Sequence, residues 1–130
     1  MPTPRWYDYA VVRVVPRVER GEFVNAGIIL SCASAGFLDA RIELDEVLLQ
    51  AMAPGTDVAP IRAALDAIPR ICAGGPAAGD IGRLSVRERF HWLVAPRSTS
   101  VQTSPVHTGR CDADFGATLD GLMQRLVRRG

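Results

Sequence analysis

The side chains best suited to chemistry gather in residues 87–112, a stretch rich in Arg and hydroxyl groups that also holds both histidines. Guanidinium groups combined with hydroxyl and backbone N–H donors are what an anion or phosphate site requires. We therefore expect Arg97, Ser98, Thr99 and His107 to line a pocket for a phosphate-bearing ligand or an acidic partner peptide. The competing interpretation is a solvated edge strand whose hydroxyls satisfy their own turns.

The two histidines, His91 and His107, are candidates for acid–base work because the pKa of imidazole lies near neutral pH. A nucleophile such as Ser104 or Cys111 would complete a dyad, and His107 is then the candidate catalytic residue. No nucleophile elbow surrounds either histidine, so a structural hydrogen bond is the favoured interpretation. Whether the protein is an enzyme stays open at this point.

Metal and nucleotide sites have little support in the sequence. His91, His107 and Cys111 could supply three zinc ligands, but their spacing matches no strong zinc pattern, so we expect no metal and no cofactor. The glycines of residues 74–82 follow no strand and precede no lysine, which argues against a nucleotide-binding loop.

The composition argues against several classes of function. All fifteen basic residues are Arg, which removes lysine Schiff-base and lysine general-base chemistry. A net charge of +1 gives no long-range field for nucleic acid, so nucleic-acid binding ranks last. No apolar run approaches the roughly 18–20 residues of a membrane span, the first residues have no signal-peptide pattern, and the three cysteines are far apart. We expect a cytoplasmic protein without membrane contact.

Hydrophobic periodicity predicts the elements that position these groups. Residues 7–15, 25–32 and 37–44 have the composition or alternation of strands, and the last exposes Asp39, Arg41 and Glu43. Helices are expected over 45–52, from Asp57 with a kink or early end at Pro69, and over 86–95. Residues 73–82 are expected to be a loop. Residues 98–108 form a fourth strand or an ordered loop, before a final helix capped by Asp112 or Asp114.

The predicted fold class is therefore α+β. One domain, residues 1–130, would contain an antiparallel sheet of three to four strands in βββ-α-α-β-α order, with the helices packed on one face.

Four segments resemble a bacterial family of unknown function, number 3037. They are residues 7–13 (YDYAVVR), 21–27 (GEFVNAG), 89–99 (RFHWLVAPRST) and 104–109 (SPVHTG), with Phe23 and Ala26 as mild departures. The resemblance implies no assigned activity and an association with a kinase-like protein of the persistence-toxin type. It adds emphasis to Asn25 within the second motif. The ligand-binding residues predicted from the motifs and their surroundings are Arg89, Arg97, Ser98, Thr99, Ser104 and His107.

Two hypotheses follow. The first is an accessory or interaction module that docks on a partner protein, because the chain is small and has no complete catalytic set. The second is an enzyme or binding domain for a phosphate-bearing small molecule, with Arg97 as the anion clamp and His107 as the acid–base group.

Overall fold

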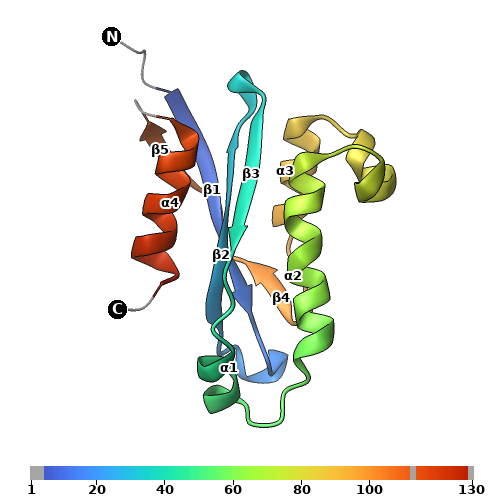
Figure 1. Cartoon of the computed structure of the whole chain (residues 1–130), viewed down its shortest axis with the longest axis vertical. Helices are drawn as coiled ribbons and strands as arrows, with labels where there is room; N and C mark the ends of the chain where they lie inside the picture. The colour runs from blue at the N-terminus through green and yellow to red at the C-terminus, as the bar shows by residue number, and fades with distance from the viewer. Residues whose placement is uncertain (1–4, 112–113, 129–130) are drawn as a thin grey trace.

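The computed structural model describes residues 5–111 and 114–128. Within them the chain forms an antiparallel sheet, four α-helices and three short 3₁₀ helices, so the predicted α+β class is confirmed (Figure 1). The strands are β1 (Arg5–Val14), β2 (Val24–Cys32), β3 (Phe37–Ile42), β4 (Val101–Thr103) and β5 (His107–Cys111). The α-helices are α1 (Glu46–Met52), α2 (Val58–Ala73), α3 (Val86–Val94) and α4 (Phe115–Leu126). The 3₁₀ helices are η1 (Val18–Arg20), η2 (Ala33–Ala35) and η3 (Pro76–Arg83).

The sheet is built around β1, the longest strand. Its order is β3-β2-β1-β4, and β5 pairs with β1 on the same edge as β4 but further toward the strand's beginning. Residues 98–108 are thus neither one strand nor one loop, because the chain pairs with β1 twice and breaks between the two pairings. Pro105 explains the break, since proline has no N–H to give to a ladder.

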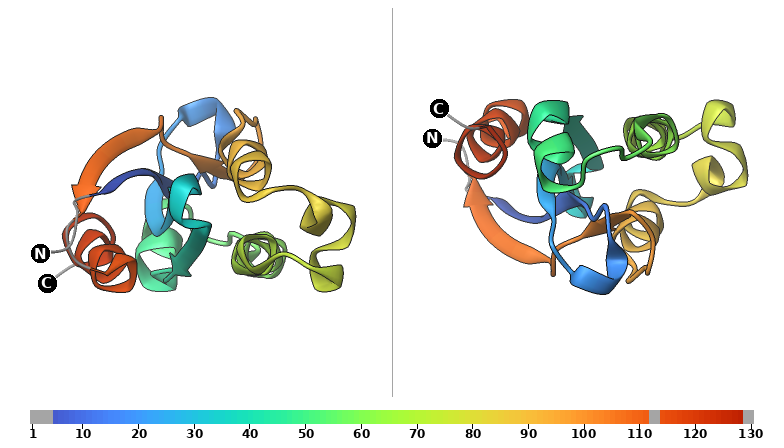
Figure 2. Two further views of the ribbon diagram at one scale, coloured as in Figure 1. Left: turned by 90° about the horizontal axis from the view of Figure 1, so that it is seen from above. Right: turned by 90° about the horizontal axis from the view of Figure 1, so that it is seen from below.

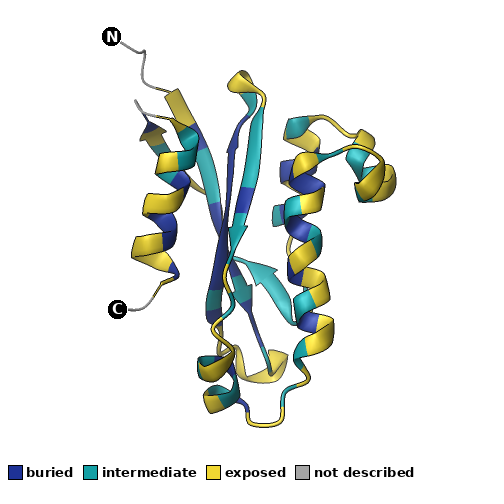
Figure 3. Cartoon of the chain, in the orientation of Figure 1, coloured by how far each residue is buried: buried dark blue, intermediate teal, exposed yellow. Residues whose placement is uncertain are grey.

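Helices cover both faces of the sheet, which corrects the prediction that they pack on one face. Alternate residues of β1 and β2 point to opposite faces because the side-chain period of a strand is two. Val12 and Ile29 belong to a core cluster with α2 and α3, whereas Val11 and Ile28 belong to a second cluster with α4. Figures 1 and 2 show α4 on one side of the strands and α2 with α3 on the other. Both faces of the central strands are therefore buried, as Figure 3 shows.

The α-helices begin at capping side chains. In each α-helix the capping side chain accepts a hydrogen bond from a backbone N–H of the first turn. The caps are Asp45 for α1, Asp57 for α2, Ser85 for α3 and Asp114 for α4. The predicted cap at Asp114 is confirmed, and the alternative, Asp112, lies outside the described residues.

The structure corrects two predictions about the helical middle of the chain. The predicted early end at Pro69 is wrong: helix α2 continues through Pro69 to Ala73, because packing of its buried face holds together a turn that lacks one backbone hydrogen bond. Residues 76–83 form the 3₁₀ helix η3, with an interruption at Gly79, rather than a plain loop. This segment projects away from the sheet (Figure 2).

A bulge in β2 shapes the end of the sheet that faces away from β5. The β1–β2 register slips between Val12, which pairs with Gly27, and Arg13, which pairs with Asn25. A Cβ on Gly27 would lie 2.5 Å from the carbonyl oxygen of Arg41, so the close approach of β3 requires glycine here. The Asn-Ala-Gly part of the second sequence motif therefore has a structural role.

Candidate functional site

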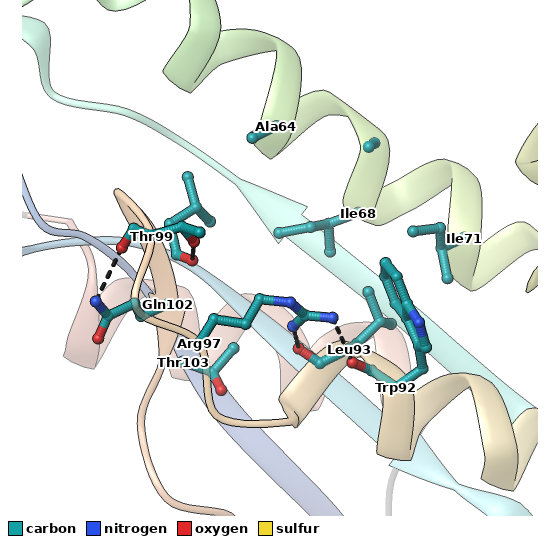
Figure 4. A pocket seen from close by; sticks show the side chains of 11 residues that line it. Ala64, Ile68, Ile71, Trp92, Leu93, Arg97, Thr99, Gln102 and Thr103 are labelled. Carbon is teal, nitrogen blue, oxygen red and sulfur yellow. Dashed lines mark hydrogen bonds between the residues drawn. The ribbon is translucent and has the colours of Figure 1, made fainter.

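A groove runs between α2 and the chain segment that joins α3 to β4. Its volume is about 270 Å³. The lining residues are Ala64, Ala67, Ile68, Ile71, Trp92, Leu93, Arg97, Thr99, Val101, Gln102 and Thr103. In Figure 4, α2 forms one wall, and Trp92 and Arg97 lie on the opposite wall. The lining is mostly apolar, and Arg97 is its single charged member.

Helix α2 supplies its wall through a second apolar stripe. Ile61, Leu65 and Cys72 belong to the stripe that enters the core. Ala64, Ala67 and Ile71 recur at i, i+3 and i+7 on a neighbouring stripe, and Ile71 also belongs to the core cluster. The prediction of site residues missed Ala64, Ala67 and Ile71, although this second periodicity is readable in the sequence.

Arg97 holds the end of α3 as well as lining the groove. Its Nη1 donates to the carbonyl oxygens of Leu93 at 3.0 Å and Ala95 at 3.4 Å, and its Nη2 donates to that of Trp92 at 2.7 Å. These carbonyls would otherwise lack partners, because Pro96 holds Ala95 extended and ends the helix. The guanidinium carbon also lies 4.5 Å from the centre of the Trp92 ring. Three of the five N–H groups are thus committed to the fold, which leaves two for a ligand.

The hydroxyl residues beside Arg97 make local turns. Thr99 Oγ1 donates to the carbonyl oxygen of Val101 at 2.9 Å, and Gln102 Nε2 donates to that of Thr99 at 2.8 Å. Thr99 and Gln102 form a polar rim on the groove, whereas Ser98 is exposed and does not line it. The structure therefore brings Arg97 and Thr99 together in one groove, with Trp92 and Gln102 beside them.

Arg89 lies elsewhere, at the end of α2. It is buried, with 9% of its surface exposed. Its Nη1 donates to the carbonyl oxygens of Ile71 at 2.9 Å and Cys72 at 2.6 Å, and its Nε donates to that of Leu84 at 3.0 Å. The guanidinium thereby joins the last turn of α2 to the end of η3. Its position indicates a structural role.

Ser104 is also buried, and it forms hydrogen bonds with β1. Its Oγ accepts a hydrogen bond from the N–H of Val11 at 2.9 Å, and its own N–H donates to the carbonyl oxygen of Val11 at 2.8 Å. The same Oγ donates to the carbonyl oxygen of Pro105 at 2.9 Å. The hydroxyl thus keeps β1 paired where the ladder passes from β4 to β5.

His107 does not line the groove. It lies at the start of β5, is exposed, and its ring centre is 5.4 Å from that of Tyr9. Tyr9 packs against the core cluster of α4, on the opposite side of the sheet from α2 and α3. The structure therefore separates His107 from Arg97, the pair that the small-molecule hypothesis combines.

The remaining reactive groups form no second site. Among residues 5–111 and 114–128, no group of three or more His, Cys, Asp or Glu side chains could hold a metal ion. Burial raises the pKa of the Cys72 thiol to about 12, so this sulfur is a poor nucleophile near neutral pH. Among residues 5–111 and 114–128, none of the helices has both the length and the hydrophobicity of a transmembrane span.

A family model matches most of the chain. The model of a family described as a protein of unknown function (DUF3037) matches residues 9–127. No curated protein and no solved structure matches the chain.

Proposed function

The chain belongs to the DUF3037 family of proteins of unknown function, whose model covers nearly all of it, and we propose that it is a cytoplasmic docking module for a partner protein. The observation that carries the proposal is the apolar groove between α2 and the α3–β4 connection. A groove with an apolar lining and a charged residue at its edge suits the side chains of a partner protein.

The mostly apolar lining of the groove favours the apolar side chains of a partner over a phosphate-bearing small molecule. The groove holds about 270 Å³, which suits one or two large side chains of a partner. Protein interfaces use such pockets for the few anchor residues that supply most of the binding energy.

Trp92 leaves part of its ring exposed at the groove, where a partner could contact it. The side chain is 41% exposed, although it stacks on the guanidinium of Arg97. Tryptophan and arginine are the residue types most enriched at interface hot spots. Together they offer an apolar contact and a positive charge to the same partner segment.

The alternative, a binding site for a phosphate-bearing small molecule, has less support. It needs Arg97 and His107 in one pocket, but the ring of His107 lies against that of Tyr9, away from the groove. Most of the donors of Arg97 already serve α3. A thermal-shift titration with inorganic phosphate and sugar phosphates tests this alternative, because a ligand at 100 times its Kd stabilises a protein by about 2.7 kcal/mol.

The docking proposal is tested with a groove-filling substitution and a matched control. Ala64→Arg places a long side chain in the groove. Ala63→Arg changes the preceding residue of α2, which is exposed and outside the groove. Arginine is a good helix former, so both variants should fold. Affinity purification from cells of the source organism should retain a protein with the wild type and with Ala63→Arg, and lose it with Ala64→Arg. Equal retention by all three forms, or retention by none, would refute the proposal.

A further inference from the structure

A second cavity continues the groove toward the start of α2. It has a volume of about 450 Å³. Its lining consists of Pro16, Thr56, Asp57, Pro60, Ile61, Ala64, Thr99, Ser100 and Val101. Three residues, Ala64, Thr99 and Val101, line both cavities. The two cavities therefore adjoin along α2, and we call them together the channel.

The channel has opposite charges at its ends. Arg97 is the only charged residue of the first cavity, and Asp57 is the only charged residue of the second. Asp57 is exposed, and one oxygen of its carboxylate accepts the capping hydrogen bond from the N–H of Ala59. The apolar side chains of α2 separate the two charges.

The length of the channel sets the length of its occupant. An α-helix rises 1.5 Å per residue, so Asp57 and Ile68, which lies beside Arg97 in Figure 4, are about 16 Å apart along α2. An extended chain covers about 3.3 Å per residue and points every second side chain to the same side. Three side chains at i, i+2 and i+4 span about 13 Å between their Cα atoms, and side-chain reach covers the remainder.

We infer that the occupant is an extended segment of a partner protein with the pattern acidic–x–apolar–x–basic. This inference rests on the proposed docking function. The acidic side chain pairs with the two remaining N–H groups of Arg97, the apolar side chain lies against Ile68 and Trp92, and the basic side chain pairs with Asp57. The order of the charges follows from the complementary charges at the ends of the channel.

The test begins with an unbiased probe. A phage-displayed random dodecapeptide library is selected on the wild-type protein, after binders of the Ala64→Arg variant have been removed. Enriched sequences should carry an acidic and a basic residue on opposite sides of an apolar residue at the stated spacing. If binders are enriched with no such charge order, the inference is wrong although the docking function stands.

A second measurement assigns each charge to its partner. The synthetic peptide acetyl-Ser-Glu-Thr-Leu-Thr-Arg-Ser-amide is titrated to millimolar concentration into the ¹⁵N-labelled protein, and the shifts of the Trp92 indole and the Ala64 and Ala67 amides are followed. Changing the peptide's Arg to Ala should weaken binding about two- to fivefold to the wild type, and have no effect on binding to Asp57→Ser. Serine keeps the helix cap, so the fold of this variant is preserved.

The outcomes separate the two proposals. Equal losses on the wild type and on Asp57→Ser would show that the basic residue does not meet Asp57, and would overturn the inference alone. If neither the synthetic peptide nor any selected peptide shifts the groove signals, the docking function fails and the inference fails with it. The variant Asp66→Asn is the control, because Asp66 is exposed on α2 and outside both cavities; it should bind like the wild type.

Discussion

Replacing Arg89 with Met should unfold the protein at a much lower urea concentration. Methionine keeps most of the volume of the side chain and removes the three hydrogen bonds to Ile71, Cys72 and Leu84. Hydrogen bonds from a charged donor contribute about 1.5–3 kcal/mol each. Since Nη1 serves two of the three carbonyls, we expect a total loss of about 3–5 kcal/mol. That is a large share of the 5–15 kcal/mol by which proteins of this kind are typically stable.

The assay is urea denaturation followed by circular dichroism. With a slope of about 2 kcal/mol per molar urea, typical for a small protein, the midpoint should fall by about 2 M. Hydrogen exchange should also accelerate at the last turn of α2 and in η3 before other regions respond, because Arg89 joins these two segments.

Arg87→Met is the matched control for this prediction. Arg87 lies two residues earlier on the same helix and is exposed, so its replacement should change the free energy of unfolding by less than about 0.5 kcal/mol. If the urea midpoint of Arg89→Met falls by less than about 0.5 M, the three hydrogen bonds contribute much less to the free energy of unfolding than expected.

Three further predictions concern the fold around the site. Gly82→Ala should destabilise the protein by at least 2 kcal/mol in urea denaturation, on the order of other overpacked sites, because its Cβ would lie 2.1 Å from the carbonyl oxygen of Gly75; an unchanged midpoint would contradict this contact. Ser104→Ala leaves the N–H of Val11 without its hydroxyl partner, which should cost about 1–3 kcal/mol and speed exchange of that amide; unchanged exchange of that amide would count against it. Burial raises the pKa of the Cys72 thiol from 9.0 to about 12, so the protonated form is favoured in the folded state and stability should fall as pH rises from 9 to 12. The loss should reach at most about 4 kcal/mol and be smaller in Cys72→Ala, and an equal pH dependence in both proteins would refute the assignment.

Much of the fold is readable from the sequence because the signals are local. The alternation of residues 37–44 and the helical spacing of Phe115, Leu119 and Leu122 each depend on neighbours within one element. Capping residues such as Asp57 and Ser85 act on backbone N–H groups two or three residues away. Short-range chemistry of this kind predicts elements well and their ends fairly well.

The side of the sheet on which each helix packs is not readable from local sequence signals. Both faces of β1 and β2 are apolar, so the sequence indicates a buried sheet without saying which helix covers which face. Helix α4 reaches the second face because the chain returns along β1 as β4 and then β5 before the helix begins. That path depends on a break at Ser104 and Pro105, whose effect appears only when the strand pairing is known.

The sequence by itself determined which side chains are available for function, and among them Arg97 and Thr99 do line the groove. Only the tertiary structure decided how each of them is used. Arg89 bonds a backbone group 17 residues away in the chain and Ser104 one 93 residues away, and His107 lies against Tyr9 on the other side of the sheet. The physical reason is that a polar side chain forms hydrogen bonds with whichever unpaired backbone N–H and C=O groups the fold places next to it. Those neighbours come from distant parts of the chain, so residue type and spacing alone do not identify them.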